Sequence, residues 1–226
     1  MDVLVFDTES CDPKTPMVIQ MSWCVYNTTD PMNNYFEKNH LIKDIDKNKQ
    51  WMKYGHNITK VMCETHGDMF REVINDFLTD AEMADVIVAH NYSSDLCKIG
   101  KDLFDREMNT ELNKFKNLCS IPKFVDTMKM CKIFLNTKKQ MKNSELYEVL
   151  SNVDVNKDML HDASYDVWIT KQNFTRMNTE SYQKYDYKNI ENILNKYKSN
   201  NDNEKKSGIN NKQDETIVSH IIDVGP

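Results

Sequence analysis

Three segments near the start of the chain each have the length and composition of a β-strand. The segments cover residues 2–6, 17–26 and 35–43, and they contain many branched and aromatic side chains. Such side chains pack well on a pleated surface. Turn-forming residues, Asp30-Pro31 and Asn33-Asn34, lie between the second and third segments. The start of the chain therefore predicts three consecutive strands.

Helical spacing dominates the rest of the chain. Apolar positions three and four residues apart predict amphipathic helices, at residues 58–63, 68–82, 92–107, 127–134, 144–150, 163–177 and 187–197. Two short apolar runs interrupt them, at 86–89 and 124–125, and the first is wholly apolar, as interior strands are. Strands and helices in this order predict an α/β domain in which helices pack on a mixed sheet.

The composition changes after residue 198. Residues 199–215 are polar and rich in Asn, Lys and Asp, which is typical of a disordered tail. Residues 217–224 are apolar enough to dock on another surface. We therefore expect one domain over residues 1–198 and a tail over residues 199–226, whose apolar end offers a docking segment for a protein partner.

Size, charge and cysteine content narrow the class of protein. The chain has 226 residues, enough for one well-packed core, and a formal net charge of −6. No run approaches the ~20 apolar residues of a membrane span, and no basic region followed by an apolar one opens the chain as a signal peptide. We expect no membrane association. Six scattered cysteines without a Cys-x-x-Cys pair indicate reduced thiols in an intracellular compartment, cytoplasmic or nuclear.

One stretch of the chain is basic, although the negative net charge argues against nucleic-acid binding by charge alone. Between residues 127 and 144 there is no acidic residue and there are five lysines, namely Lys129, Lys132, Lys138, Lys139 and Lys142. Such a stretch suits contact with a phosphate backbone. A solvated helix face and loop explain it equally well.

The first strand ends in an acidic pair. Asp7 and Glu9 follow the apolar residues 3–6, and residues two apart on a strand point to the same face. Two adjacent carboxylates repel, and one of them takes up a proton unless a cation compensates. Hard oxygen ligands of this kind favour Mg²⁺ or Mn²⁺. The pair therefore predicts a divalent-metal site.

A second polar group follows the apolar run 86–89. His90 ends this run, and Asn91 and Asp95 lie four residues apart, which places them on one face of the predicted helix. That face lies at the carboxyl ends of the strands, where open α/β sheets bind ligands. Capping accounts for Asn91, because Asn is common at helix N-termini, but Asp95 lies too far into the helix to be a cap.

A third group surrounds the start of the predicted helix 163–177. We expect Asp166 to be held on the helix and His161 to lie just before it on a movable segment, which suits a metal ligand beside a base. Asp162 is a rival for the ligand, since it lies four residues before Asp166. Its alternative role is to compensate the charge of the helix N-terminus.

Together these groups resemble the motifs of the DEDDh branch of the DnaQ-like 3′–5′ exonuclease superfamily. They occur in the family's order, as Phe6-Asp7-Thr8-Glu9, His90-Asn91-x-x-x-Asp95 and His161-x-x-x-x-Asp166. Weaker similarities lie at residues 20–23, 56–59, 125–127 and 144–147, so the match covers residues 1–177. One departure is Ser94, where many relatives carry an aromatic residue.

The resemblance implies an RNase H-like fold, with three antiparallel N-terminal strands, further parallel strands and flanking helices. It implies that two Mg²⁺ or Mn²⁺ ions are held by four carboxylates, those of Asp7, Glu9, Asp95 and Asp166. It implies that His161 is the base that takes the proton of the attacking water. It also implies that the substrate is contacted by Thr8, Glu9, Asn91 and His161.

The implied activity is hydrolysis of the phosphodiester bond next to a free 3′ end of DNA or RNA, with release of nucleoside 5′-monophosphates. Two other classes of protein are compatible with the motifs: a proofreading or editing subunit of a larger polymerase assembly, and a nucleic-acid-binding module without catalysis. The presence of all five chemical positions favours an enzyme, because four clustered acids repel one another in a domain that has no use for them.

Overall fold

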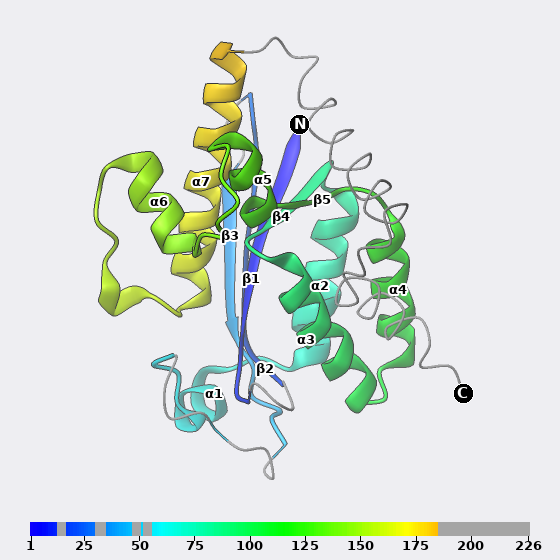
Figure 1. Ribbon diagram of the computed structural model, residues 1–226. Coiled ribbons are helices and arrows are strands. Elements are labelled where there is room, and N and C mark those ends of the chain that lie inside the picture. Colours follow the sequence, from blue (N-terminus) through cyan, green and yellow to red (C-terminus); the bar gives the residue numbers. More distant parts are fainter. Residues whose placement is uncertain (13–16, 30–34, 47–50, 52–55, 185–226) are drawn as a thin grey trace.

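A mixed five-stranded sheet forms the centre of the protein. The computed structural model describes residues 1–12, 17–29, 35–46, 51 and 56–184 (Figure 1). The predicted turn within residues 30–34, the helix at 187–197 and the tail at 199–226 lie outside these residues. The strands are β1 (Asp2–Ser10), β2 (Val18–Asn27), β3 (Tyr35–Leu41), β4 (Val86–Ala89) and β5 (Phe124–Asp126). Their order in the sheet is β3-β2-β1-β4-β5.

The first three strands are antiparallel, whereas β4 and β5 run parallel to β1. The prediction of an RNase H-like mixed sheet with three antiparallel N-terminal strands is therefore confirmed. The helices are α1 (Lys60–His66), α2 (Phe70–Met83), α3 (Tyr92–Asp105), α4 (Asn109–Ser120), α5 (Thr127–Phe134), α6 (Asn143–Ser151) and α7 (Ala163–Lys184), with a 3₁₀ turn at Lys157–Met159. Among the described residues, no helix combines the length and apolar character that a bilayer span requires.

Helix α4 has no counterpart in the elements that the sequence predicts. Its buried residues include Leu112, Phe115 and Leu118, which recur every three positions. This spacing is helical, but lysines and asparagines separate the apolar residues and make the segment polar on average. Packing against the core made by α2 and α3 stabilises α4, although its own sequence is polar on average.

The two faces of β1 pack against different groups of helices. Leu4 and Phe6 point into a core formed with α2, α3 and α4, while Val3 and Val5 point into a core formed with α5, α6 and α7. Figure 1 shows these two groups of helices on opposite sides of the sheet. Because side chains alternate along a strand, each residue after Phe6 also belongs to one side or the other.

Strand β1 extends beyond its parallel neighbour. The β1–β4 register joins residues 3–5 of β1 to residues 86–88 of β4, whereas β2 pairs with β1 as far as Ser10. Residues 7–9 therefore have β2 on one side and no strand of the described chain on the other. The space beside the end of β1 is filled by side chains from α3.

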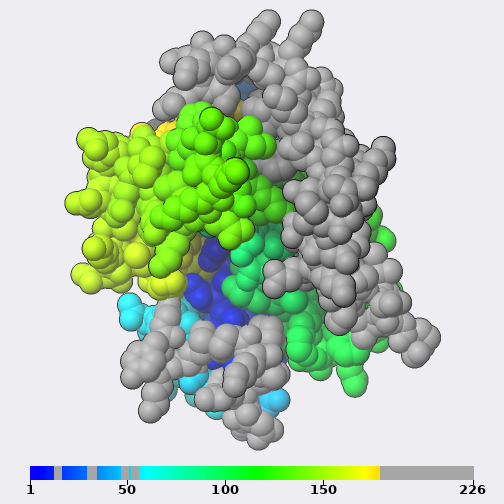
Figure 2. Space-filling view, viewed as in Figure 1, coloured from blue at the N-terminus to red at the C-terminus, as the bar shows by residue number. Residues whose placement is uncertain are grey.

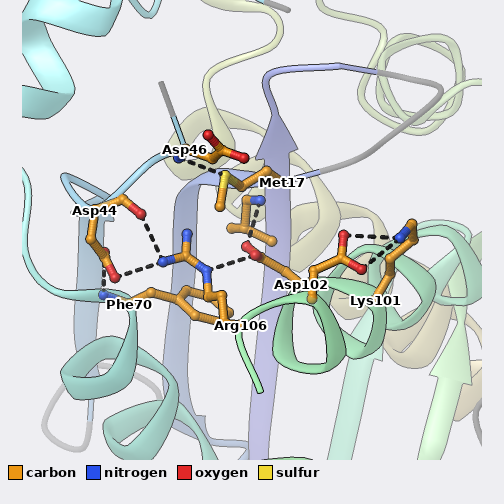
Figure 3. A network of polar contacts seen from close by, with 9 residues as sticks. Met17, Asp44, Asp46, Phe70, Lys101, Asp102 and Arg106 are labelled. Atoms are coloured by element: carbon orange, nitrogen blue, oxygen red, sulfur yellow. Dashed lines mark hydrogen bonds and ion pairs between the residues drawn. The ribbon is translucent and has the colours of Figure 1, made fainter. Parts of the chain in front are cut away.

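A buried polar network fixes the far end of α3 (Figure 3). The Arg106 guanidinium donates to Asp102 Oδ1 over 2.6 Å and to Asp44 Oδ2 over 2.6 Å. Asp102 also accepts from the backbone N–H of Val18 at the start of β2, and Asp44 accepts from the backbone N–H of Phe70 at the start of α2. The network thus ties α3 to the sheet and to α2, and it holds α3 in place beside β1.

We expect Arg106→Met to lower the free energy of unfolding by about 3–5 kcal/mol, because the substitution leaves the buried Asp102 carboxylate without its charge partner. The matched control is Lys101→Met on the same helix, which removes an exposed ion pair with Asp105 and should cost less than about 1 kcal/mol. Urea unfolding followed by circular dichroism measures both values. Equal losses in the two variants would contradict this role of the network.

Candidate metal centre

Two acidic residues of β1 meet the start of α7 on one face of the sheet. Asp7 and Glu9 follow Val3 and Val5 on the side of β1 that faces α7. One ligand atom each from Glu9, His161 and Asp166 lies within 4.8 Å of the other two. The structure therefore brings together the first and third groups that the sequence singles out, across more than 150 residues of chain.

Burial and neighbouring charges both disfavour the ionised forms of these carboxyls. Burial raises the pKa of Asp7 well above its usual range, and the charges of Asp95 and Asp166 raise it further. Burial also raises the pKa of Glu9 to about 8. Burial raises the pKa of Asp166 too, although His161 acts in the opposite direction. A cation at this place would relieve all three shifts.

Asp95 reaches the same place from the other face of the sheet. It lies in the first turn of α3 and is almost fully buried. The Thr8 hydroxyl donates to Asp95 Oδ1 over 2.6 Å. Thr8 alternates with Asp7 and Glu9 and so points toward α3. The charges of Asp95 and Asp166 act on both Asp7 and Glu9, so the carboxylates of Asp7, Glu9, Asp95 and Asp166, here called the carboxylate cluster, lie near one another at the end of β1. Asp7 and Asp95 are not in the described group whose ligand atoms lie within 4.8 Å of one another.

Lys98 is a charged neighbour of the cluster that the motifs did not include. Its ammonium group donates to the Thr8 carbonyl over 2.8 Å and lies 3.3 Å from Asp95 Oδ1. The signal for this contact was present in the sequence, because Lys98 lies three residues after Asp95 and side chains at this spacing share a helix face.

His161 and Asp162 take different roles at the start of α7. His161 is exposed, precedes the helix and has a left-handed backbone with φ of 64°. The Asp162 carboxylate accepts from the backbone N–H and the hydroxyl of Ser164, as expected for a residue that caps a helix. Gln20 of β2 accepts from the backbone N–H of Ala163 and holds the start of α7 on the sheet.

Asn91 differs from the expectation that it shares a helix face with Asp95. It precedes α3 with a left-handed φ of 65°, a conformation that Asn adopts more readily than most residues. Its backbone N–H donates to Asp126 Oδ1, which also accepts from Met128 at the start of α5. Asn91 therefore links the ends of β4 and β5. Its side-chain oxygen accepts a hydrogen bond from the Ser93 hydroxyl.

His90 anchors a basic loop beside the cluster. A carbonyl can only accept, so His90 Nε2 donates to the Met141 carbonyl over 2.9 Å, and Nδ1 accepts from the Thr127 hydroxyl. Burial lowers the pKa of His90, in keeping with a neutral ring. At the other end of the loop, the Asn143 side chain donates to the Asp166 backbone carbonyl. Residues 135–142, here called the basic loop, are thus fixed between β4 and α7.

These elements surround a hollow in the surface. Figure 2 shows β1, in dark blue, at the bottom of this hollow, with the α3 side and the α6–α7 side as its walls. Carboxylate oxygens and one imidazole are donors that hard and borderline divalent cations accept. Burial first, and the neighbouring carboxylates after it, raise the pKa of Asp7, Glu9 and Asp166, and a bound cation would favour their ionised forms. The donor set therefore fits a divalent cation.

Comparison with known proteins finds the fold of this chain in solved structures. Neither family models nor curated protein sequences match the chain. Among solved structures, the RNase domain of the yeast Pop2 protein is similar with a TM-score of 0.61 and 15% identity, over 80% of this chain and 78% of that one. Exonuclease I from Methylocaldum szegediense is similar with a TM-score of 0.57 and 14% identity, over 79% of this chain and 40% of that one.

A full-length 3′-exonuclease is similar with a TM-score of 0.54 and 15% identity, over 81% of this chain and 60% of that one. The chain therefore spans less than two thirds of the length of the latter two proteins. At these identities the likeness concerns the fold. The chain has the RNase H-like α/β fold of these nuclease structures, which is the fold that the resemblance of its motifs to the DnaQ-like exonuclease superfamily implies.

Proposed function

We propose that the protein is a divalent-metal-dependent 3′–5′ exonuclease, which hydrolyses the phosphodiester bond next to a free 3′ end of DNA or RNA. The observation that carries the proposal is that Glu9, His161 and Asp166 offer ligand atoms within 4.8 Å of one another, beside the buried Asp7, on which the charges of Asp95 and Asp166 act. Three neighbours of the same fold are described as an RNase domain and as exonucleases, which supports a nuclease.

The metal ions would be held by the four carboxylates of the cluster. Bound Mg²⁺ or Mn²⁺ ions activate a nucleophile and stabilise the charge that develops on the attacking and leaving oxygens. Burial raises the pKa of Asp7, Glu9 and Asp166, and a bound cation would favour their ionised forms.

His161 would accept the proton of the attacking water. It is exposed at the edge of the hollow and its ligand atom lies within 4.8 Å of those of Glu9 and Asp166. The water oxygen attacks the phosphorus, the bond to the 3′ oxygen of the preceding nucleotide breaks, and a nucleoside 5′-monophosphate leaves. Neutral histidine is a suitable proton acceptor because its ordinary pKa is about 6.5.

The basic loop would bind the strand upstream of the 3′ end. His90 and Asn143 fix the loop beside β4 and α7, and Lys138 and Lys142 are exposed on it. Lys139 makes only a long, exposed contact of 3.4 Å with Glu145. These ammonium groups are therefore available to phosphates that approach the cluster.

We expect Asp7→Asn, Asp95→Asn and Asp166→Asn each to lower the rate more than about 100-fold. Loss of a residue that only supports a metal ligand already costs about 10–100-fold, and these residues would be ligands themselves. The assay follows the Mg²⁺- or Mn²⁺-dependent shortening of 5′-labelled single-stranded DNA, RNA and duplexes with a 3′ overhang, with EDTA as the blank. Asp162→Asn is the matched control, because Asn also caps helices. Activity in Asp166→Asn together with its loss in Asp162→Asn would show that the ligand of α7 is misassigned.

We expect His161→Ala to lose about 10²–10⁴-fold in rate near neutral pH, as removal of a general base does, and to keep its Mn²⁺ affinity. The wild-type rate should rise with pH, because only neutral histidine accepts a proton, and this rise should flatten in the variant. Initial rates between pH 5.5 and 8.5 measure it. His66→Ala, at an exposed position on α1, is the control. An unchanged pH–rate profile in His161→Ala would show that His161 is not the general base.

We expect the double variant Lys138→Gln/Lys142→Gln to raise KM and leave kcat nearly unchanged, because its lysines bind the strand without touching the reacting atoms. The slope of log KM against log salt should fall by about 0.7 for each phosphate contact to a single strand. The control is Lys114→Gln, an exposed position on α4. Equal salt slopes in wild type and the double variant would show that the loop is only a solvated surface.

A further inference from the structure

Lys98 occupies an unusual position for a lysine. Its side chain is only 23% exposed, and it extends from α3 to the end of β1. Its ammonium group donates to the Thr8 carbonyl and lies beside Asp95 Oδ1, an oxygen that the Thr8 hydroxyl also contacts. Lysine is rarely buried unless its charge is compensated. The carboxylate cluster supplies this compensation.

The cluster therefore has two chemically different sides. On the α3 side, the Lys98 charge acts on Asp7, Glu9 and Asp95. On the α7 side, Glu9 and Asp166 lie beside His161, and their ligand atoms are close enough to share one ion. One side of the cluster thus already has a cation from the protein, and the other has donors arranged for an ion.

A purely structural role for Lys98 would look different. The Thr8 carbonyl lies beyond the end of β4 and needs a hydrogen-bond donor, and any neutral donor would satisfy it. A neutral donor would also avoid the cost of burying a charge. The proximity of the ammonium group to Asp95 points to the charge, and not only the donor, as the useful property.

We propose that the Lys98 ammonium is a built-in counter-cation on the Asp95 side of the carboxylate cluster, so that a divalent ion binds first on the Glu9–Asp166 side and a second ion must displace Lys98. The inference rests on the proposed metal site. It assigns to Lys98 a positioning role: the residue holds Asp95 and the Thr8 carbonyl in place until the second ion arrives.

The experiment is a titration of the full-length protein with Mn²⁺, followed by calorimetry and by the electron paramagnetic resonance signal of free Mn²⁺, without substrate. Wild type is compared with Lys98→Met, Lys98→Gln and Lys98→Arg. Gln keeps a neutral donor for the Thr8 carbonyl, and Arg keeps the charge. Lys101→Met, one turn along the same helix and paired with Asp105, is the matched control.

We expect wild type to bind one Mn²⁺ more tightly than a second. In Lys98→Met and Lys98→Gln the second dissociation constant should fall at least about tenfold, because the charge that opposes the ion has been removed. Lys98→Arg and Lys101→Met should behave as wild type. Melting temperatures should fall in Lys98→Gln without metal and recover when Mn²⁺ is added.

Three results would contradict the inference in distinguishable ways. If Lys98→Gln binds both ions as wild type does, Lys98 acts only as a donor to Thr8, and the nuclease proposal stands. If the loss of melting temperature persists with Mn²⁺, Lys98 is structural. If wild type binds no Mn²⁺ at all, the inference and the proposed metal-dependent nuclease are both overturned.

Discussion

Repulsion among the carboxylates at the end of β1 is the constraint around which the rest of this structure is arranged. Burial alone raises the pKa of Asp7 and Glu9, and each neighbouring carboxylate adds to the effect. Without compensation such a cluster favours protonation or unfolding. Positive or polar groups on both sides of the cluster reduce this repulsion, namely Lys98 and Thr8 from one face and the start of α7 from the other.

The sheet makes this arrangement possible because β1 is longer than its parallel neighbour. If β4 continued alongside residues 7–9, its backbone would occupy the place that α3 now fills with Asp95 and Lys98. The short β4 also lets His90 and Asn91 turn away and hold the basic loop and the end of β5. A difference of a few residues in strand length thus creates the hollow and sets its walls.

Local periodicity was enough to predict most elements, whereas the grouping of acidic residues from three distant segments rested on the resemblance of their motifs to those of a known family. The two-residue spacing of Asp7 and Glu9 on a strand follows from backbone geometry, and so does the position of His161 just before α7. The features that the sequence did not predict depend on contacts between residues that are distant along the chain. The helix α4 depends on a core made by distant residues, and Asn91 takes a left-handed conformation because Asp126, from another strand, accepts its N–H.

The groups of the cluster are distributed along the chain in a way that affects its synthesis. The order of the chain is β1, then α3, then α7, and His161 and Asp166 come last. A chain still on the ribosome has made Asp7, Glu9 and Asp95 long before it has made their partners on α7. The full donor set therefore exists only once α7 has been made.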